Sequence, residues 1–373
     1  MALRILQVCT GNLYGGVETV MINMAQARAA YRDLVCEYSV CFEGSFKDQL
    51  AATGVTVHSI PSARLRNPLS VWRARKVFAE VVKNGNFNAA IFHSSWSHAI
   101  FGPVAKAQGL ASIPWIHGVP HRRNFTDWWA NRVGASFVIC NSKHTMNRLT
   151  RHYFPYSPRK CFYNPIPMAR VRDARMEVRR ELGTDPDRVV IFQASRMEDW
   201  KGHRTLIGGL ASIKDLPNWE CWIAGAPQQE SERRYFASLQ ELASRHGVND
   251  KVRFLGHRGD IPRLLAGADI FCQPNLGPEP FGNVFVEALA AGLPVVSTAI
   301  GGAQEIVTPS CGLLVRPGAD DLLGSCLATL ILNPDMRQRL SEGGPKRARE
   351  LSDPRRQLRY FEYLIGLGLA EAA

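Results

Sequence analysis

The sequence predicts an α/β protein made of two doubly wound, Rossmann-like units that follow one another along the chain. Short apolar or β-branched runs alternate with helix-like stretches, which is typical of a parallel sheet covered by helices on both faces. A proline-containing segment at 164–168 interrupts this alternation, which then starts afresh. At 373 residues the chain is also too long for one ordinary hydrophobic core and suits two domains of comparable size.

Seven runs in the first half have strand character, and they cover residues 4–9, 36–42, 55–60, 89–93, 112–117, 136–141 and 160–164. Helix-like stretches lie between them at 17–29, 68–82, 97–108 and 143–152. The segment Asn164-Pro165-Ile166-Pro167-Met168 is predicted to be a linker, because X–Pro steps disfavour helix and strand alike.

The second half repeats the pattern, with strand-like runs at 188–194, 219–225, 252–255, 269–273, 294–298 and 312–315. Its clearest helices are expected at 231–246, 319–332 and 335–351, and residues 353–367 have the pattern of one more amphipathic helix. We therefore expect a first domain at 1–167 and a second at 168–352, with a cleft between them. Ligands of such sheets bind outside the carboxyl ends of the strands, so the loops after strands are the places to search.

The composition is that of an ordinary soluble globular protein, with 46% hydrophobic and 21% charged residues. No run of eighteen or more apolar residues is present, so no spanning helix is predicted. The start, MALRILQVCT, indicates a buried first strand rather than a signal peptide. Nine scattered cysteines without CxxC spacing are expected to be buried thiols in a reducing cytoplasm, and no clustered ligands predict a metal site.

The net charge of +12 is the one unusual bulk property. Such a field attracts phosphate-bearing partners, whether nucleotides, nucleic acid or an anionic membrane surface. It does not choose among them.

The most informative segment runs from Pro278 to Val296, PEPFGNVFVEALAAGLPVV. It begins in a Gly- and Pro-rich loop and enters a helix near Gly282 and Asn283. The amides of Gly282, Asn283 and Val284 then point back into the loop, where they and the helix dipole suit a phosphate.

Two acids flank this helix entry: Glu279 lies before it and Glu287 about one turn inside it. Carboxylates suit paired hydroxyls, because each oxygen accepts an O–H bond. One acid could therefore bind a sugar beyond the phosphates and the other a ribose. The alternative is a loop acid and a solvated helix acid.

A second segment, Ala194-Ser195-Arg196-Met197-Glu198-Asp199-Trp200-Lys201-Gly202, follows the first strand of the second half. Arg196 and Lys201 leave one strand end five residues apart, and two such cations can clamp a diphosphate as its charge develops. The alternative is a solvated turn.

Two further features follow strands in the first half. Thr10-Gly11-Asn12-Leu13-Tyr14-Gly15-Gly16-Val17-Glu18 places the glycine pair Gly15–Gly16 at a helix entry, where backbone can approach a ligand closely. It is not GxGxxG, which argues against a nicotinamide-dependent dehydrogenase. His117 ends a strand in Pro114-Trp115-Ile116-His117-Gly118, and His93 is a weaker candidate of the same kind.

Together these segments resemble the retaining glycosyltransferases of family 4, which have the two-domain GT-B fold. The resemblance runs over nearly the whole chain and rests on the N-terminal glycine pair, His117, Asn141-Ser142-Lys143, Asn164-Pro165, Arg196, Lys201-Gly202, Ala224-Gly225, Phe254-Leu255-Gly256, Glu279 through Glu287, and Gly301-Gly302-Ala303-Gln304-Glu305-Ile306-Val307.

The resemblance implies a role for each matching residue. Glu279 would bind donor-sugar hydroxyls and Glu287 the ribose, and His117 would lie near the transferred sugar. The diphosphate would be held by Arg196, Lys201, the Gly15–Gly16 loop and the Phe281, Gly282, Asn283 and Val284 segment. It further implies metal- and cofactor-independent, retaining transfer of a hexose, with UDP favoured over GDP on family frequency, and a C-terminal helix at 353–373 that crosses back onto the first domain. Gly118 departs from the family pattern, in which an acid is common at that position.

The acceptor is expected to be a glycan, a lipid-linked sugar or a small molecule bound by the first domain. Arg64, Arg66, Arg73, Arg75 and Lys76 surround Trp72, and Arg122-Arg123 precede Phe125, Trp128 and Trp129. A basic stretch with aromatics can rest on an anionic membrane, so we expect a cytoplasmic protein with weak peripheral contact at the inner face. The alternative is a solvated basic helix.

The leading rival function is a nucleotide-sugar epimerase of GT-B type. It would need acids or bases at the sugar ring rather than an open acceptor site. A nucleic-acid binder is not indicated, because the basic residues form no recognisable RNA- or DNA-binding module. An inactive scaffold is disfavoured by the presence of the full set of site residues.

Overall fold

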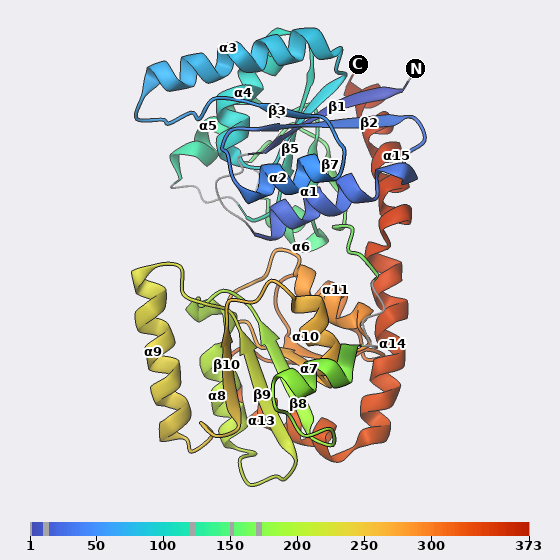
Figure 1. Cartoon of the computed structure of the whole chain (residues 1–373). Coiled ribbons are helices and arrows are strands. Elements are labelled where there is room, and N and C mark those ends of the chain that lie inside the picture. The colour runs from blue at the N-terminus through green and yellow to red at the C-terminus, as the bar shows by residue number, and fades with distance from the viewer. Residues whose placement is uncertain (1, 10–14, 120–123, 150–152, 169–173, 373) are drawn as a thin grey trace. The chain divides into compact units, whose positions relative to one another are not determined.

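The computed structural model describes residues 2–9, 15–119, 124–149, 153–168 and 174–372. Its contacts divide the chain into two compact units. Unit 1 comprises Met1–Ile166 with Ser352–Ala373, and unit 2 comprises Pro167–Leu351. Both are Rossmann-like α/β units built on a parallel sheet, as the sequence predicts (Figure 1).

Unit 1 contains a seven-stranded parallel sheet in the order β3-β2-β1-β4-β5-β6-β7. Its strands are β1 (Leu3–Cys9), β2 (Leu34–Val40), β3 (Val57–Ser59), β4 (Ala89–Phe92), β5 (Ala111–Ile116), β6 (Val138–Cys140) and β7 (Arg159–Cys161). The chain winds outward from β1 to β3 and then returns to β4 on the other side. The pairing of β1 with β4 is therefore the point where the strand order reverses.

The helices of unit 1 are α1 (Gly16–Gln26), η1 (Arg28–Ala30), α2 (Ser45–Ala52), α3 (Pro68–Gly85), α4 (Ser95–Ala107), α5 (Phe125–Val133), α6 (Lys143–Arg148) and α15 (Pro354–Ala372). One face of the sheet packs against α1, α2 and α15, and the other packs against α3 and α4. The last helix thus completes the core of the first unit, with Leu358, Phe361, Leu364 and Ile365 at most 2% exposed.

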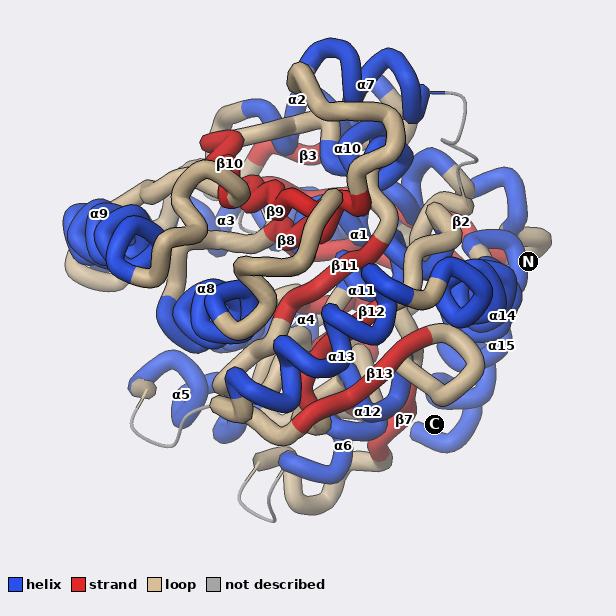
Figure 2. The backbone as a smooth tube through the Cα atoms, turned by 90° about the horizontal axis from the view of Figure 1, so that it is seen from below, coloured by secondary structure: helices blue, strands red, loops and turns tan. Residues whose placement is uncertain are grey.

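Unit 2 contains a six-stranded parallel sheet in the order β10-β9-β8-β11-β12-β13 (Figure 2). Its strands are β8 (Val189–Ala194), β9 (Trp219–Ala224), β10 (Val252–Gly256), β11 (Ile270–Gln273), β12 (Val295–Thr298) and β13 (Gly312–Val315). The order reverses between β8 and β11, so a ligand crevice is expected beyond the carboxyl ends of these two strands.

The helices of unit 2 are α7 (Arg175–Glu181), η3 (Asp199–Lys201), α8 (His203–Ala211), α9 (Glu230–Arg245), α10 (Ile261–Gly267), α11 (Asn283–Ala290), α12 (Ala303–Ile306), α13 (Asp320–Leu332) and α14 (Pro334–Ser352). Side chains alternate between the two faces along each strand. Ile191 and Cys221 pack with α8, α9 and α13, while Phe271 meets Phe285 of α11 on the opposite face at 6.1 Å between ring centroids.

The structure adds helices that no clear pattern predicts and shortens one that was expected. The additional helices include α2, α5, α7 and α10, which are nine residues long or shorter. Such lengths cover too few turns for a periodic apolar stripe to stand out. The helix expected at 143–152 ends at Arg148, because Leu149 has extended backbone, and residues 150–152 lie outside the described part of the chain.

All nine cysteines are free thiols, and six of them are buried, as expected. No helix within the described residues is long and apolar enough to cross a membrane.

Candidate active site

The predicted site residues of unit 2 lie in the loops that follow β8 and β11, at the reversal of strand order. Lys201 comes from the turn after β8, and Glu279 comes from the loop after β11. The Lys201 Nζ donates to Glu279 Oε2 at 2.6 Å, and both side chains are largely buried. Lys201 Nζ also lies 3.9 Å from the centroid of the Trp200 ring, a cation–π contact. The structure therefore brings together two residues that the sequence could only place at two separate strand ends.

Asn275 holds Glu279 from the other side, and sequence reasoning missed it. Its Nδ2 donates to Glu279 Oε2 at 3.2 Å, while its Oδ1 accepts from Gln273 Nε2 at 3.1 Å. The hydroxyl of Thr298 donates to the Asn275 carbonyl oxygen at 2.6 Å. Asn275 is 1% exposed, so these bonds fix a buried support beneath the carboxylate. The only local signal was its place in the loop after a predicted strand.

The Glu279 loop rests on a glycine pair, Gly301–Gly302. The amide of Gly302 donates to the Glu279 carbonyl oxygen at 2.7 Å. A Cβ on Gly302 would lie 2.2 Å from the carbonyl oxygen of Phe281, and a Cβ on Gly301 would lie 2.5 Å from that of Glu279. Only glycine permits this approach. The Phe281 side chain is itself buried, so any contact of this residue with a donor would come through its backbone.

The helix entry expected near Gly282 and Asn283 is present as the start of α11. Gly282 has a φ of 104°, in the region that favours glycine, and this turns the chain from the loop into the helix. No side chain caps the helix at Gly282. The first amides of α11, with Asn283 and Val284 in its first turn, therefore give this end a positive dipole next to the Glu279 loop.

Glu287 lies on α11, and burial raises the pKa of its carboxyl to about 7. No ion pair or side-chain hydrogen bond joins it to another residue in the described part of the chain. A carboxyl in this state has unused acceptor capacity that a ligand's hydroxyl groups could fill.

Arg196 is not part of the Lys201–Glu279 cluster. Its side chain is exposed and pairs with Glu198 Oε1 at 2.8 Å. Glu198 in turn accepts from Trp200 Nε1 at 3.0 Å through its other oxygen. Among the described residues, the side chain of Arg196 is linked to Lys201 only through Glu198 and Trp200, which the sequence analysis did not single out.

The predicted site residues of unit 1 lie at the carboxyl ends of its own strands. His117 follows β5 and His93 follows β4, and their rings are stacked with centroids 5.3 Å apart. Gly15 and Gly16 begin α1, where the Gly15 amide donates to Glu18 Oε2 at 3.0 Å. Burial raises the pKa of Glu18. Residues 10–14 of the predicted glycine loop lie outside the described residues.

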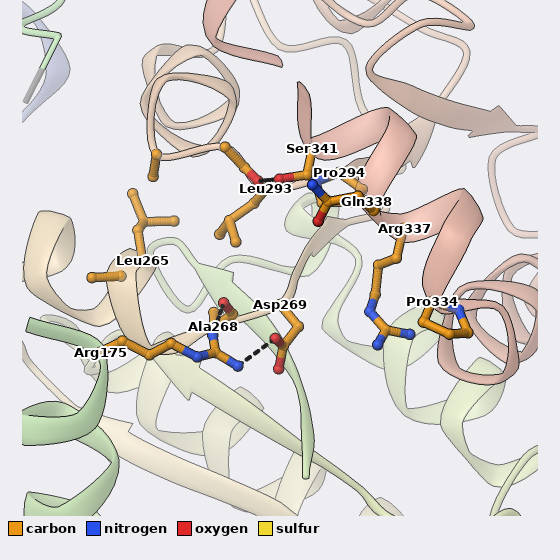
Figure 3. A pocket seen from close by; sticks show the side chains of 13 residues that line it. Arg175, Leu265, Ala268, Asp269, Leu293, Pro294, Pro334, Arg337, Gln338 and Ser341 are labelled. Carbon is orange, nitrogen blue, oxygen red and sulfur yellow. Dashed lines mark hydrogen bonds and ion pairs between the residues drawn. The ribbon is translucent and has the colours of Figure 1, made fainter. Parts of the chain in front are cut away.

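The cavity shown in Figure 3 is a different place in unit 2, at the amino ends of β11 and β12, with a volume of about 350 Å³. Its most conspicuous acid is Asp269, which pairs with Arg175 at 2.7 Å and with the buried Arg179 at 2.6 Å. Asp269 also accepts from the Val190 amide at 2.8 Å. These charges satisfy one another and connect α7 to the sheet. In the described part of the chain, no group of three or more His, Cys, Asp and Glu residues is placed to hold a metal ion.

Comparison with known proteins identifies the family. Residues 14–170 match the model described as Glycosyltransferase Family 4, and residues 174–347 match Glycosyl transferases group 1. A GDP-mannose-dependent monoacylated alpha-(1-6)-phosphatidylinositol monomannoside mannosyltransferase of Corynebacterium glutamicum is 34% identical over 287 residues, which are 71% of this chain and 73% of that protein. The chain belongs to the group 1 glycosyltransferases of family 4.

Another relative is similar to part of the glycosyltransferase, and two solved structures share its fold. The lipopolysaccharide core biosynthesis glycosyltransferase LpsE of Rhizobium meliloti is 32% identical over 167 residues, which span 44% of this chain and 46% of LpsE. Anabaena HepE in complex with UDP and glucose superposes with a TM-score of 0.83 at 24% identity, over 98% of this chain and 99% of HepE. A glycosyltransferase from Rickettsia africae superposes with a TM-score of 0.84 at 20% identity, over 99% of both chains. The fold of the glycosyltransferase is therefore GT-B.

Substituting Gly302 should displace the Glu279 loop. We expect Gly302→Ala to lower the free energy of unfolding by about 1–3 kcal/mol, because its Cβ meets backbone rather than a flexible side chain. We expect turnover to fall at least about tenfold, because a carboxylate shifted by an ångström loses its working geometry. Gly259→Ala is the matched control, since a Cβ there meets nothing within 4 Å. Unchanged turnover in Gly302→Ala would show that this packing does not position the site.

The raised pKa of Glu287 makes a prediction about stability and pH. The folded protein holds this proton more tightly than the unfolded chain, whose ordinary value is 4.5. The associated stability is therefore present below pH 4.5 and is lost as the pH rises through about 7. The free energy of unfolding of the native protein should fall by about 1–3 kcal/mol between acidic and mildly alkaline pH because of Glu287. In Glu287→Gln this part of the pH dependence should be absent. Urea unfolding across that range measures it, with the exposed Glu230→Gln as control. Parallel pH profiles for Glu287→Gln and the native protein would contradict a raised pKa for Glu287.

Proposed function

We propose that this glycosyltransferase moves a hexose-type sugar from a nucleotide diphosphate sugar to an acceptor hydroxyl, with retention at the anomeric carbon and without a metal or other cofactor. The observation that carries the proposal is the Lys201–Glu279 pair, supported by Asn275, beside the amino end of α11. A cation, helix amides and a hydroxyl-binding carboxylate are the groups that a sugar diphosphate requires.

In this proposal the donor is held by its two ends. Glu279 accepts hydrogen bonds from hydroxyls of the sugar, and Glu287 accepts them from the ribose. The α11 amides and Lys201 bind the diphosphate. Lys201 has three N–H bonds, of which one reaches Glu279, so it can donate to a phosphate oxygen while it keeps that pair. From unit 1 we assign Gly15–Gly16 to the diphosphate and His117 to the transferred sugar, as the family resemblance implies.

The chemical step breaks the bond between the anomeric carbon and the diphosphate oxygen. The acceptor oxygen attacks on the same face, and its proton passes to the leaving phosphate oxygen, so no protein nucleophile is needed. Negative charge accumulates on the departing diphosphate, and Lys201 and Arg196 stabilise it. Arg196 would have to leave Glu198 to reach the diphosphate, and its exposed side chain can make that change at small cost.

For the base we favour UDP, with GDP next. HepE was solved with UDP and glucose, whereas the Corynebacterium relative is named as GDP-mannose-dependent. The names of relatives such as that enzyme and LpsE support a glycan or lipid-linked acceptor in polysaccharide or glycoconjugate biosynthesis.

We also propose weak peripheral contact with the inner face of a membrane through unit 1. Trp72 of α3 and Phe125 and Trp128 of α5 are 61%, 60% and 49% exposed. Cations accompany these rings, with Arg132 lying 4.7 Å from the Trp128 ring centroid and Lys76 lying 5.9 Å from that of Trp72. Exposed aromatics beside cations suit an interface that is apolar below and anionic above. Arg122-Arg123 lie outside the described residues.

Glu279→Ala should abolish transfer, and it should also lower the free energy of unfolding, because it leaves the largely buried Lys201 ammonium without its partner. The measurement is product formation from nucleotide sugar and acceptor, with the exposed Glu230→Ala as control. Unchanged turnover would defeat the site assignment. Conversion of the donor to an epimer without acceptor would favour the epimerase instead.

Lys201→Ala should weaken nucleotide diphosphate binding by about 10- to 100-fold, because it removes a charge-assisted hydrogen bond. Calorimetry with UDP and with GDP measures the loss and identifies the base at the same time. Equal affinity of Lys201→Ala and the native protein for the preferred nucleotide would contradict the diphosphate role of this lysine.

Sedimentation with vesicles tests the membrane proposal. The protein should co-sediment with anionic vesicles at physiological salt, and less so at high salt, because screening weakens the contact. Trp72→Ala combined with Trp128→Ala should reduce co-sedimentation, whereas Met176→Ala, an exposed apolar residue of unit 2, should not. Absence of co-sedimentation at physiological salt would remove the proposal.

A further inference from the structure

Three side chains at the reversal of strand order in unit 1 form a buried chain of hydrogen bonds. Gln7 lies in β1, His93 follows β4, and His117 follows β5. His93 Nε2 is 2.7 Å from Gln7 Oε1, and His93 Nδ1 is 3.1 Å from His117 Nε2. Gln7 is fully buried and His93 is nearly so. Bonds in such a site are not exchanged freely with water, so each proton in the chain has a defined place.

The positions of the protons follow from the partners. Gln7 Nε2 points to Cys36 Sγ at 3.6 Å, so its Oε1 faces His93. A carbonyl oxygen only accepts, and His93 Nε2 must therefore carry the proton. Burial holds the pKa of His93 well below its ordinary value and lowers that of His117 to about 3, so both rings are neutral near pH 7. Neutral His93 then accepts at Nδ1, and His117 carries its proton on Nε2.

The His117 ring is also held in place. It stacks on Trp115 with centroids 5.0 Å apart, and its edge meets His93 through the hydrogen bond between the two rings. Asn141 Nδ2 donates to the His117 carbonyl oxygen at 3.2 Å, which fixes the backbone. The other ring nitrogen of His117, Nδ1, has no hydrogen-bond partner among the described residues, and it is not among the fully buried atoms that lack one. A fixed ring thus offers one hydrogen-bond acceptor.

We propose that Gln7 and His93 are positioning residues that hold His117 as its Nε2–H tautomer, so that Nδ1 selects a sugar presenting a hydroxyl there rather than a carboxylate. The inference rests on the proposed function for the placement of His117 beside the transferred sugar. A hydroxyl can donate to the Nδ1 lone pair. The carboxylate of a uronic acid has no proton to donate, and its lone pairs would be repelled by the lone pair on Nδ1 of the neutral imidazole. The site therefore favours neutral hexoses.

The identity of residue 7 matters to this selection. A carboxylate in place of the Gln7 amide would stabilise a protonated imidazole and let the histidine pair carry a positive charge. The neutral amide accepts a hydrogen bond equally well but provides no charge. Burial keeps the pair neutral in the native protein, and Gln7→Glu would convert the same geometry into one that attracts an anion.

The first test is the tautomer itself, which requires no knowledge of the substrate. Nitrogen chemical shifts of the histidine rings in the full-length protein distinguish protonated from unprotonated nitrogens. We expect His117 to be protonated at Nε2 only, and His93→Leu to give a mixture of tautomers at His117. His58→Gln alters a histidine of β3 that is not part of these hydrogen bonds, and it should leave the His117 nitrogen signals unchanged. A proton on His117 Nδ1 in the native protein would overturn the proposal.

The second test is selectivity, measured with nucleotide sugars that carry the base identified by calorimetry. The native protein should prefer the hexose to the matching uronic acid by about 10-fold, the value of one good hydrogen bond. His93→Leu should raise KM for the hexose donor and leave the affinity for the free nucleotide diphosphate unchanged. Gln7→Glu should narrow or reverse the preference and add a proton to the histidine pair.

The outcomes separate this inference from the proposed function. If the native protein bound no nucleotide sugar, the proposed function would be wrong. The tautomer of His117 could still be measured, because that experiment needs no substrate. Normal binding with equal affinity for hexose and uronic acid would overturn the inference alone. Unchanged KM and an unchanged His117 tautomer in His93→Leu would also overturn it, and urea unfolding of each variant confirms that the measurement concerns folded protein.

Discussion

Lys201 and Glu279 join two loops that are 78 residues apart in the sequence, at the reversal of strand order in unit 2. Neither charge would be stable there alone, because a largely buried ion needs a partner. The rest of this edge is arranged around the pair. Asn275 donates to the carboxylate, the Trp200 ring lies against the ammonium, and Gly302 allows the backbone of the Glu279 loop to approach closely. The pair also has unused donors and acceptors, which is the condition for binding a ligand without first breaking the support.

The two units use different electrostatics at corresponding places in their sheets. Unit 2 presents a cation, helix amides and carboxylates, which suit a charged diphosphate and its flanking hydroxyls. Unit 1 presents two imidazoles that burial keeps neutral, and one of them is hydrogen-bonded to the amide oxygen of Gln7. In the proposed function, the charged groups of unit 2 would bind the diphosphate of the donor, and the neutral hydrogen-bonding groups of unit 1 would discriminate one sugar from another.

Local sequence patterns were sufficient for the fold and for the positions of the main site residues. The alternation of apolar runs predicted two parallel-sheet units, and the glycine-rich entry placed the start of α11 within a residue. The contacts that make the site were not predictable, because they join distant segments. Asn275 shows no local pattern that distinguishes it from an ordinary loop residue, and the contact of Gly302 with the Glu279 loop depends on a segment distant in the sequence. The pairing of Arg196 with Glu198 was missed for a related reason, since the direction of an exposed side chain is set by its neighbours in space.

The position of α15 in the first unit has a consequence for how the protein is made. Most of unit 1 precedes unit 2 in the chain, yet the core of unit 1 includes Leu358, Phe361, Leu364 and Ile365, which follow unit 2. Unit 2 is encoded without interruption between Pro167 and Leu351. During synthesis the core of unit 1 therefore stays incomplete until α15 has been made, whereas unit 2 needs no segment that comes after Leu351. We therefore expect unit 2 to be able to fold before unit 1 is complete, with the docking of α15 as the closing step for unit 1.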